Sequence, residues 1–248
     1  AHPRLIGRFQ EDVVVLALLS RLTDAVAGQW GTAPLHRFTL DDIPRMTRAL
    51  DQSGWRHAQS LAAYSPVYHY MWNGLLAYWW MELEGAFCLF AQSPDGWFMP
   101  LPPIGAGSID APLCKAMGLL RRWNGDSPVR RVENVPSQLV PEFERLGYRL
   151  TPKEPDYLYC ATDLEALAGD RYRSHRALCN RFEREQSFEM SSYQVGDRQD
   201  CRALLADWSR QKQAEGLESF GTMLLADAAP AHEVVWSQAA ALRLTAKV

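Results

Sequence analysis

The sequence predicts an α/β fold (an α+β mixed sheet), organised as two lobes in succession of which the second is incomplete in this chain. Short apolar runs bounded by tight-turn residues alternate with segments of helical periodicity, which is typical of this class. The same alternation begins again after residue 161. We therefore expect a helical lead-in over residues 1–33, a first lobe over 34–161, and a linker helix with the truncated start of a second lobe over 162–248.

The first elements are predicted from an aliphatic stripe and two helix-start residues. The stripe, spaced by one helical turn within the lead-in, consists of Val14, Leu18, Leu22 and Val26. A short strand is expected over 35–39, followed by a helix over 41–50 that begins at the capping residue Asp41. Residues 64–72 should be helical after Pro66, since proline is favoured in the first helical turn.

Three strands joined by tight turns should form the centre of the first lobe. Their expected ranges are 76–83, 86–92 and 97–101. The turns between them are predicted from Glu84-Gly85 and from Pro94-Asp95-Gly96, so these strands should be antiparallel neighbours. The later elements of this lobe are a loop over 102–108, a helix over 110–125, a strand over 129–132, a helix over 136–147, and strands over 148–150 and 156–160.

After residue 161 the sequence predicts a second, shorter series of elements. In order, these are a helical stretch capped by Asp163, a strand over 188–193, an amphipathic helix over 197–213, a further helix over 218–241 and a strand over 242–248. Because the series stops after its second strand, we expect an open sheet edge at 242–248, and self-association of the chain through that edge.

Composition excludes several classes of protein. The 248 residues are 47% hydrophobic and 22% charged with a formal charge of −3, which argues against a disordered chain and against a uniformly basic surface. The five cysteines include no CxxC pair, so we interpret them as reduced thiols instead of a disulfide framework or zinc site. No apolar run reaches the roughly 20 residues of a spanning helix, and we expect a cytoplasmic protein without a metal site.

The richest segment in potential chemistry is 169–184, which contains five arginines. At helical spacing Arg173, Arg176, Asn180 and Arg184 form one stripe, with Arg171 and Arg181 nearby, and an apolar stripe consists of Tyr172, Leu178, Cys179 and Phe182. Forked guanidinium donors suit phosphate or carboxylate. The alternative is a solvated face whose arginines pair with Glu183, Glu185 and other acids.

Two further observations point to a family. The element order over 35–160 is similar to that of the GNAT (acyl-CoA N-acyltransferase-like) fold. The motifs are Tyr157-Leu-Tyr, Thr162-Asp-Leu to Gly169, Arg171-Tyr172-x3-Arg176-x3-Asn180-Arg181-Phe182, Ser65 to Tyr70-x-Trp72, and Pro100 to Gly105. Together they resemble the soluble bacterial proteins that share the C-terminal domain of phosphatidylglycerol lysyltransferases, over about residues 35–248.

The resemblance implies tandem GNAT-like lobes and a transferase that moves an aminoacyl group from aminoacyl-tRNA to a lipid or small acceptor. It implies tRNA as a partner, and anionic lipid with a location peripheral to the inner face of the membrane. The substrate-binding residues that we expect are Arg171, Tyr172, Arg173, His175, Arg176, Asn180, Arg181, Tyr157 and Tyr159. No catalytic residue or nucleophile can be named.

Two other functions remain open at this stage. One is an acyl-CoA-dependent N-acyltransferase, because the loop after the third central strand keeps Gly105-Ala-Gly107, although Pro102 and Pro103 remove backbone donors there. The other is a GNAT-like module that binds without catalysis. His175 is a candidate general base or a structural histidine, whereas His36, His57, His69 and His232 lack the spacing of metal ligands.

Overall fold

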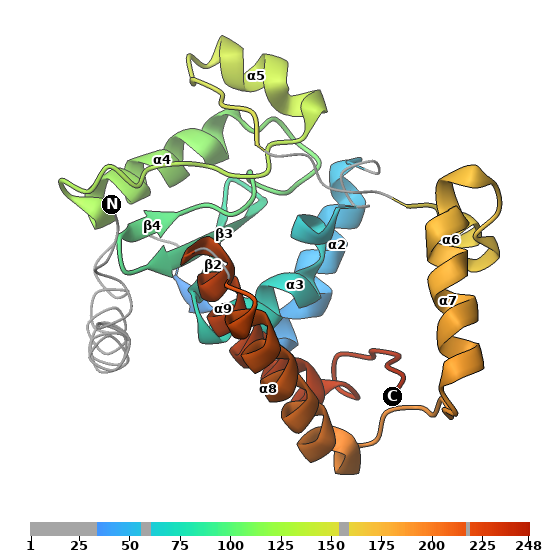
Figure 1. Ribbon diagram of the computed structural model, residues 1–248. Coiled ribbons are helices and arrows are strands. Elements are labelled where there is room, and N and C mark those ends of the chain that lie inside the picture. The colour runs from blue at the N-terminus through green and yellow to red at the C-terminus, as the bar shows by residue number, and fades with distance from the viewer. Residues whose placement is uncertain (1–33, 56–60, 154–158, 217–218) are drawn as a thin grey trace. The chain divides into compact units, whose positions relative to one another are not determined.

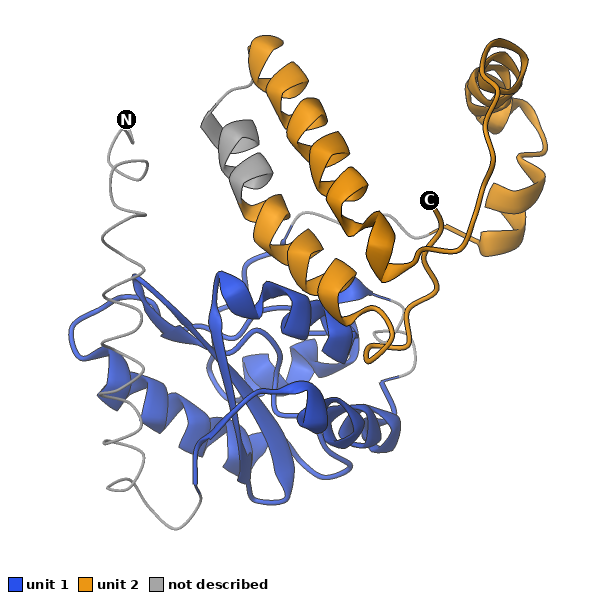
Figure 2. Ribbon diagram, turned by 90° about the horizontal axis from the view of Figure 1, so that it is seen from below, with its two compact units in different colours: residues 1–153 blue, residues 154–248 orange. Residues whose placement is uncertain are grey.

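The computed structural model describes residues 34–55, 61–153, 159–216 and 219–248; over 219–226 it describes the backbone alone. The chain divides into two compact units, residues 1–153 and 154–248, which are coloured separately in Figure 2. The predicted lead-in helix over 1–33 lies outside the described residues, as does most of the predicted strand over 156–160. The predicted lobe boundary at residue 161 therefore stays a prediction.

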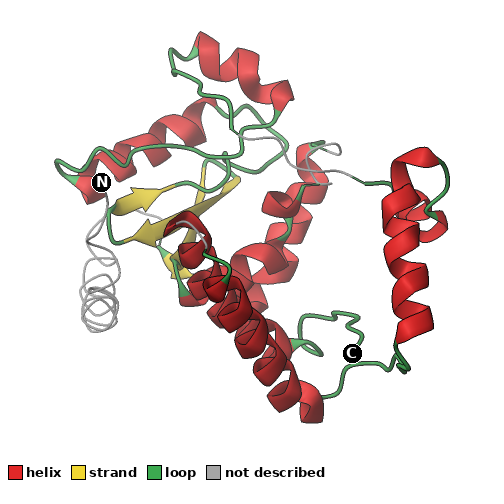
Figure 3. Ribbon diagram, viewed as in Figure 1, coloured by secondary structure: helices red, strands yellow, loops and turns green. Residues whose placement is uncertain are grey.

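Unit 1 is built on a four-stranded antiparallel sheet with the strand order β1-β2-β3-β4 (Figures 1 and 3). The strands are β1 (His36–Arg37), β2 (Ala77–Leu83), β3 (Ala86–Ser93) and β4 (Gly96–Phe98). Trp80 lies opposite Leu89, and Ala91 lies opposite Phe98. These pairs confirm the prediction of three antiparallel neighbours, although the third strand, predicted over 97–101, ends at Phe98. Gly85 and Gly96 in the two tight turns adopt the positive φ angles, 75° and 142°, that such turns favour.

Alternate side chains of the central strands pack into two hydrophobic clusters, one on each face of the sheet. Tyr78 and Trp80 belong to the cluster that contains Met46 and Leu50 of α2 (Ile43–Ser53). Their neighbours in the other cluster are Trp79, Met81 and Leu83, together with Ala116, Leu119 and Leu120 of α4 (Asp110–Asn124). The period of two along a strand therefore gives a sheet that is buried on both faces.

The remaining helices of unit 1 agree with the sequence pattern, with small shifts at their ends. Among the described residues these α-helices are α3 (Pro66–Met71) and α5 (Val140–Arg145), each of which carries a proline in its first turn. The predicted strand over 148–150 is wrong: these residues form no ladder with the described chain, and Tyr148 packs on Phe143 with ring centroids 5.6 Å apart. Apolar burial against the core, without strand pairing, accounts for the pattern of this segment.

Beyond β4 the chain changes partners. Met99 forms a parallel bridge with Val132, which is all that remains of the predicted strand over 129–132, and Ile104 returns to pair with Phe87 of β3. Between the pairs Phe98–Ala91 and Ile104–Phe87, five residues (99–103) stand opposite three (88–90). The strand therefore contains a bulge of two extra residues at the point where it leaves its parallel neighbour.

Unit 2 consists mainly of helices. They are α6 (Ala161–Ala166), α7 (Arg173–Glu185), α8 (Arg198–Ala214) and α9 (Ser219–Gln238), so the predicted helices over 197–213 and 218–241 are confirmed. The strands predicted over 188–193 and 242–248 are reduced to one antiparallel bridge between Ser192 and Lys247. Flanking hydrogen bonds extend this short ladder, among them Ser191 N–H to Val248 O at 2.9 Å.

The two units differ in how they bury apolar side chains. Both hydrophobic clusters of the described residues lie in unit 1. By contrast, every large hydrophobic side chain that is exposed in the described chain lies in unit 2, from Tyr159 to Val248, and the most exposed are Leu204 (71%) and Val195 (70%). In the described ranges no helix is long and apolar enough to cross a membrane.

Candidate functional site

Two arginines of the predicted basic segment bind within unit 2 itself. The Arg171 guanidinium forms an ion pair with Asp163 at 2.5 Å and lies 4.7 Å from the centre of the Tyr172 ring. Arg176 donates hydrogen bonds to two backbone carbonyls, those of Leu167 and Gly169, the second at 2.6 Å. Arg171 and Arg176 therefore tie α7 to α6 and to the turn between the two helices.

Arg173 and Asn180 have a different environment, since both are exposed and the side chain of neither forms a hydrogen bond or ion pair with the described residues. They are seven residues apart, or nearly two helical turns, so their side chains leave the helix in almost the same direction. An unpaired guanidinium beside an amide offers up to seven N–H donors and one amide oxygen to a ligand. This side of α7 is suited to an anion with several oxygen atoms.

The C-terminal part of α7 supplies two more arginines, which share one acid. Arg181 and Arg184 approach Glu185 at 3.3 Å and 3.4 Å, and all three side chains are well exposed. Each such surface ion pair contributes at most about 1 kcal/mol, so these arginines can exchange Glu185 for another anion at little cost. Arg184 lies on the same side of the helix as Arg173, because eleven residues make about three turns.

The other predicted site residues have separate positions. Tyr172 is buried at the start of α7, and the exposed ring of His175 lies 6.1 Å from it. Tyr159 is exposed, whereas Tyr157 lies outside the described residues. The other members of the predicted apolar stripe, Leu178, Cys179 and Phe182, are exposed, and the ring of Phe182 lies 5.0 Å from that of Phe188. The basic side of α7 is therefore the part of this segment suited to a charged ligand.

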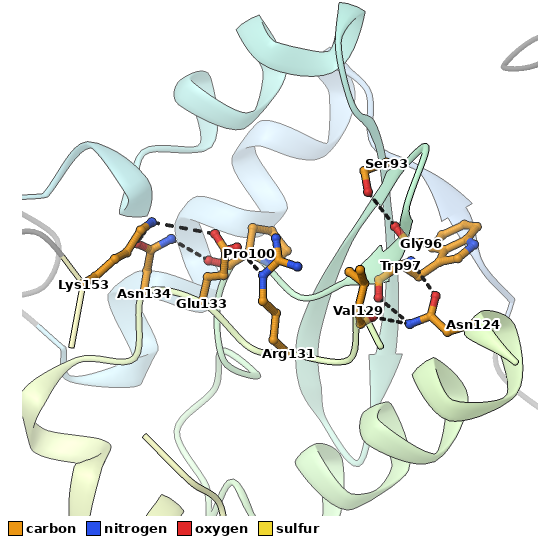
Figure 4. A network of polar contacts seen from close by, with 10 residues as sticks. All are labelled: Ser93, Gly96, Trp97, Pro100, Asn124, Val129, Arg131, Glu133, Asn134 and Lys153. Carbon is orange, nitrogen blue, oxygen red and sulfur yellow. Dashed lines mark hydrogen bonds and ion pairs between the residues drawn. The ribbon is translucent and has the colours of Figure 1, made fainter. Parts of the chain in front are cut away.

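A second polar cluster lies in unit 1, at the carboxyl end of the parallel bridge (Figure 4). Asn134 donates to the carbonyl of Pro100 at 2.9 Å and accepts a hydrogen bond from Lys153 at 3.1 Å. The backbone carbonyl of Asn134 accepts a hydrogen bond from the Tyr64 hydroxyl. Glu133 forms ion pairs with Arg131 at 2.6 Å and with Lys153 at 3.7 Å. These contacts connect the segment that follows Met99 with the segment that follows Val132, at the point where the two diverge.

The bulge beside this cluster contains a backbone donor that has no partner among the described residues. Residues 100–104 are all buried, and three of the five are prolines, which have no N–H. Of the two remaining amides, Ile104 donates to the carbonyl of Phe87 at 2.9 Å. The Leu101 N–H forms no hydrogen bond with the described residues. Buried N–H groups without an acceptor are rare in folded proteins, so this one marks a place where an acceptor oxygen would be stabilised.

The loop that follows the bulge is poorly suited to a pyrophosphate. Asp110 occupies the first turn of α4, where an anion would have to approach the helix N-terminus. Arg145 binds both oxygens of this carboxylate, at 2.6 Å and 2.7 Å, and its hydrogen bonds hold the pKa of Asp110 below the usual range. The negative end of this pair repels phosphate from the amides of the first turn.

A known protein family matches most of this chain. The family described as "Phosphatidylglycerol lysyltransferase, C-terminal" matches residues 57–233. The chain belongs to this family. The match includes all of α7 and the polar cluster of unit 1, and it confirms the family predicted from the Arg-Tyr and Asn-Arg-Phe motifs.

A solved structure gives independent information about the fold. It is described as the crystal structure of a conserved protein of unknown function from Bacteroides thetaiotaomicron VPI-5482. The TM-score is 0.65 at 20% sequence identity, and the match covers 88% of this chain and 71% of that chain. At this identity the likeness shows a shared fold alone. No curated protein matches the chain.

Sequence reasoning did not single out the residues at the carboxyl end of the parallel bridge. Glu133 and Asn134 directly follow a predicted strand, and polar residues at that position are a usable signal in sheets with parallel neighbours. Tyr64 and Lys153 carry no such signal, because 70 residues separate Tyr64 from the carbonyl that it binds. Within the described ranges no group of three histidine, cysteine or acidic residues could hold a metal ion.

Proposed function

We propose that the protein is an acyltransferase that moves an aminoacyl group from aminoacyl-tRNA to a lipid or small acceptor. The observation that carries this proposal is the family match over residues 57–233, since the family is named for lysyl transfer to phosphatidylglycerol. Two features of the described structure support it: a helix side with unpaired anion-binding groups in unit 2, and a backbone donor without a partner in unit 1.

The topology of unit 1 supports a GNAT-like lobe. Four antiparallel strands are followed by α4, and the chain then returns to form a parallel bridge beside the end of β4. We propose that unit 2 begins a second lobe of the same kind, with its short ladder between Ser192 and Lys247 as the counterpart of the first strands. Ligands of sheets with parallel neighbours bind at the carboxyl ends where the strands diverge.

In this proposal the chemistry needs little from side chains. The hydroxyl or amine of the acceptor attacks the carbonyl carbon of the aminoacyl ester, the bond to the ribose oxygen breaks, and that oxygen takes up the proton that the acceptor loses. Negative charge develops on the carbonyl oxygen during the attack, and a fixed N–H donor stabilises it. We assign this role to the Leu101 N–H, which lies in the bulge and has no acceptor among the described residues.

The basic side of α7 favours tRNA over acyl-CoA as the donor. Arg173 and Asn180 are open to a phosphate backbone, and Arg181 and Arg184 can join them by releasing Glu185. The corresponding position for an acyl-CoA pyrophosphate, at the start of α4, is occupied by the Asp110–Arg145 pair. Anionic lipid at the inner membrane surface is the proposed acceptor surface.

Two binding measurements test the proposal. Filter retention of charged tRNA should show saturable binding that weakens with salt, and calorimetry with acyl-CoA should show none. If the protein bound acyl-CoA but not tRNA, the acyl donor would be a thioester instead of aminoacyl-tRNA. If it bound tRNA but transferred the amino acid to no acceptor, the protein would be a binding module without catalysis. Retention of neither donor would contradict the proposal.

A further inference from the structure

Arg171, just before α7, and Arg176, within it, differ from the other arginines of this segment in what they bind. Arg176 is the one arginine of this helix that is partly buried, and its Nη1 donates to the carbonyls of Leu167 and Gly169. Both acceptors follow the last turn of α6, where helix carbonyls have no partner within the helix. Their residues adopt positive φ angles, 46° and 83°, so the turn is tight and its carbonyls converge on one donor.

Arg171 contacts the opposite end of the same short helix. Its guanidinium pairs with Asp163 in the first turn of α6 and stacks over the ring of Tyr172, which is buried at the start of α7. Asp163 also accepts the hydrogen bond from the Leu167 N–H at 2.8 Å through its backbone carbonyl. Two arginines five residues apart therefore contact both ends of α6. Because the Arg171–Asp163 pair is an exposed surface ion pair, Arg176 provides the larger part of this connection.

We infer that Arg171 and Arg176 are positioning residues, which fix the direction of α7 so that Arg173 and Asn180 face the polyanion. Nη1 of Arg176 donates to both carbonyls, and moving the guanidinium to a phosphate would leave those carbonyls unpaired. The side chains of Arg173 and Asn180 form no hydrogen bond or ion pair with the described residues, so their donors are available to a ligand. The ligand in this inference rests on the proposed function, whereas the tie between α6 and α7 does not.

Hydrogen exchange tests the tie in the free protein. In Arg176→Ala, amides of residues 161–176 should exchange about 10- to 100-fold faster, the change expected when a charge-assisted hydrogen bond is lost. Arg176→Lys should recover part of the protection, because an ammonium group can reach one carbonyl but lacks the planar fork. Arg173→Ala should leave exchange unchanged. Equal exchange in wild type, Arg176→Ala and Arg171→Ala would overturn the inference.

The salt dependence of tRNA binding separates positioning from contact. Arg176→Ala should weaken binding with an unchanged slope of log affinity against log salt, because no phosphate contact is lost. Arg173→Ala should lower that slope by about 0.7–0.9. A slope reduced equally by both substitutions would make Arg176 a direct contact and overturn the inference. If no tRNA binds to the wild type, the proposed function fails, while the exchange measurement still decides whether the tie exists.

Discussion

Replacing Arg173 by alanine removes a guanidinium that is exposed and has no ion pair or hydrogen bond with the described residues. No contact among the described residues depends on this charge, so the free energy of unfolding should change by less than about 0.5 kcal/mol. If the side chain meets a tRNA phosphate, its loss should appear only in binding. The substitution therefore separates a ligand contact from a structural role.

The magnitude follows from counterion release. One phosphate contact changes the slope of log affinity against log salt by about 0.7–0.9, so between 1 M and 0.1 M salt it contributes about 5- to 8-fold in affinity. Arg173→Ala should bind tRNA about 5- to 8-fold more weakly at 0.1 M salt and by a smaller factor at higher salt. Glu185→Gln should act in the opposite direction, because it releases Arg181 and Arg184 from their shared acid.

Filter retention over a salt series, with urea denaturation of the same samples, measures both quantities. Arg48→Ala is the matched control: Arg48 is also exposed on a helix, α2, and has no partner among the described residues. It should change neither stability nor affinity. If Arg173→Ala lowered stability and left the tRNA affinity unchanged, Arg173 would have a structural role and would not contact tRNA.

The remaining predictions concern stability and association. Asn124→Ala should lower the free energy of unfolding by about 2–4 kcal/mol in urea denaturation. The reason is that the Asn124 side chain makes hydrogen bonds with both backbone groups of Trp97 and with the carbonyl of Val129. A loss under about 1 kcal/mol would contradict this prediction. Burial lowers the pKa of His69 to about 4, below the unfolded value of about 6.5. The unfolded chain then binds more protons, so unfolding free energy should fall by about 3 kcal/mol as pH drops from about 6.5 to 4, and His69→Gln should abolish that slope. Because the exposed large hydrophobic residues lie in unit 2, the chain should self-associate or bind a hydrophobic dye, and a dye-silent monomer in light scattering would count against it.

The sequence was sufficient for elements whose signals are local. Gly85 and Gly96 mark turns, and alternating apolar residues between them predict β2 and β3 to within one residue at each end. The parallel bridge of Met99 with Val132 was not predictable in this way, because its partners are far apart in sequence and each contributes a single residue. The bulge was missed for the same reason, since it is defined only by the register of both flanking pairs.

For the candidate site, the sequence identified the basic helix but could not assign its arginines. Arg173 and Arg176 look alike in a helical projection, yet only Arg176 is near the carbonyls of Leu167 and Gly169. That difference depends on the turn between α6 and α7, which adopts positive φ angles at a leucine as well as at a glycine. Pro102 and Pro103 were interpreted as a loss of donors, whereas in the structure the Leu101 N–H beside them has no acceptor among the described residues.

Transfer of a labelled amino acid from tRNA to an acceptor is the direct test of the proposed aminoacyltransferase activity. The protein would be incubated with tRNA charged with a mixture of radiolabelled amino acids, and with vesicles that contain phosphatidylglycerol, before the lipid phase and small molecules are separated from tRNA. Label should leave the tRNA and appear in a lipid or small acceptor, faster than hydrolysis without protein. Label that stays on the tRNA, while a labelled acyl group from acyl-CoA is transferred instead, would contradict it.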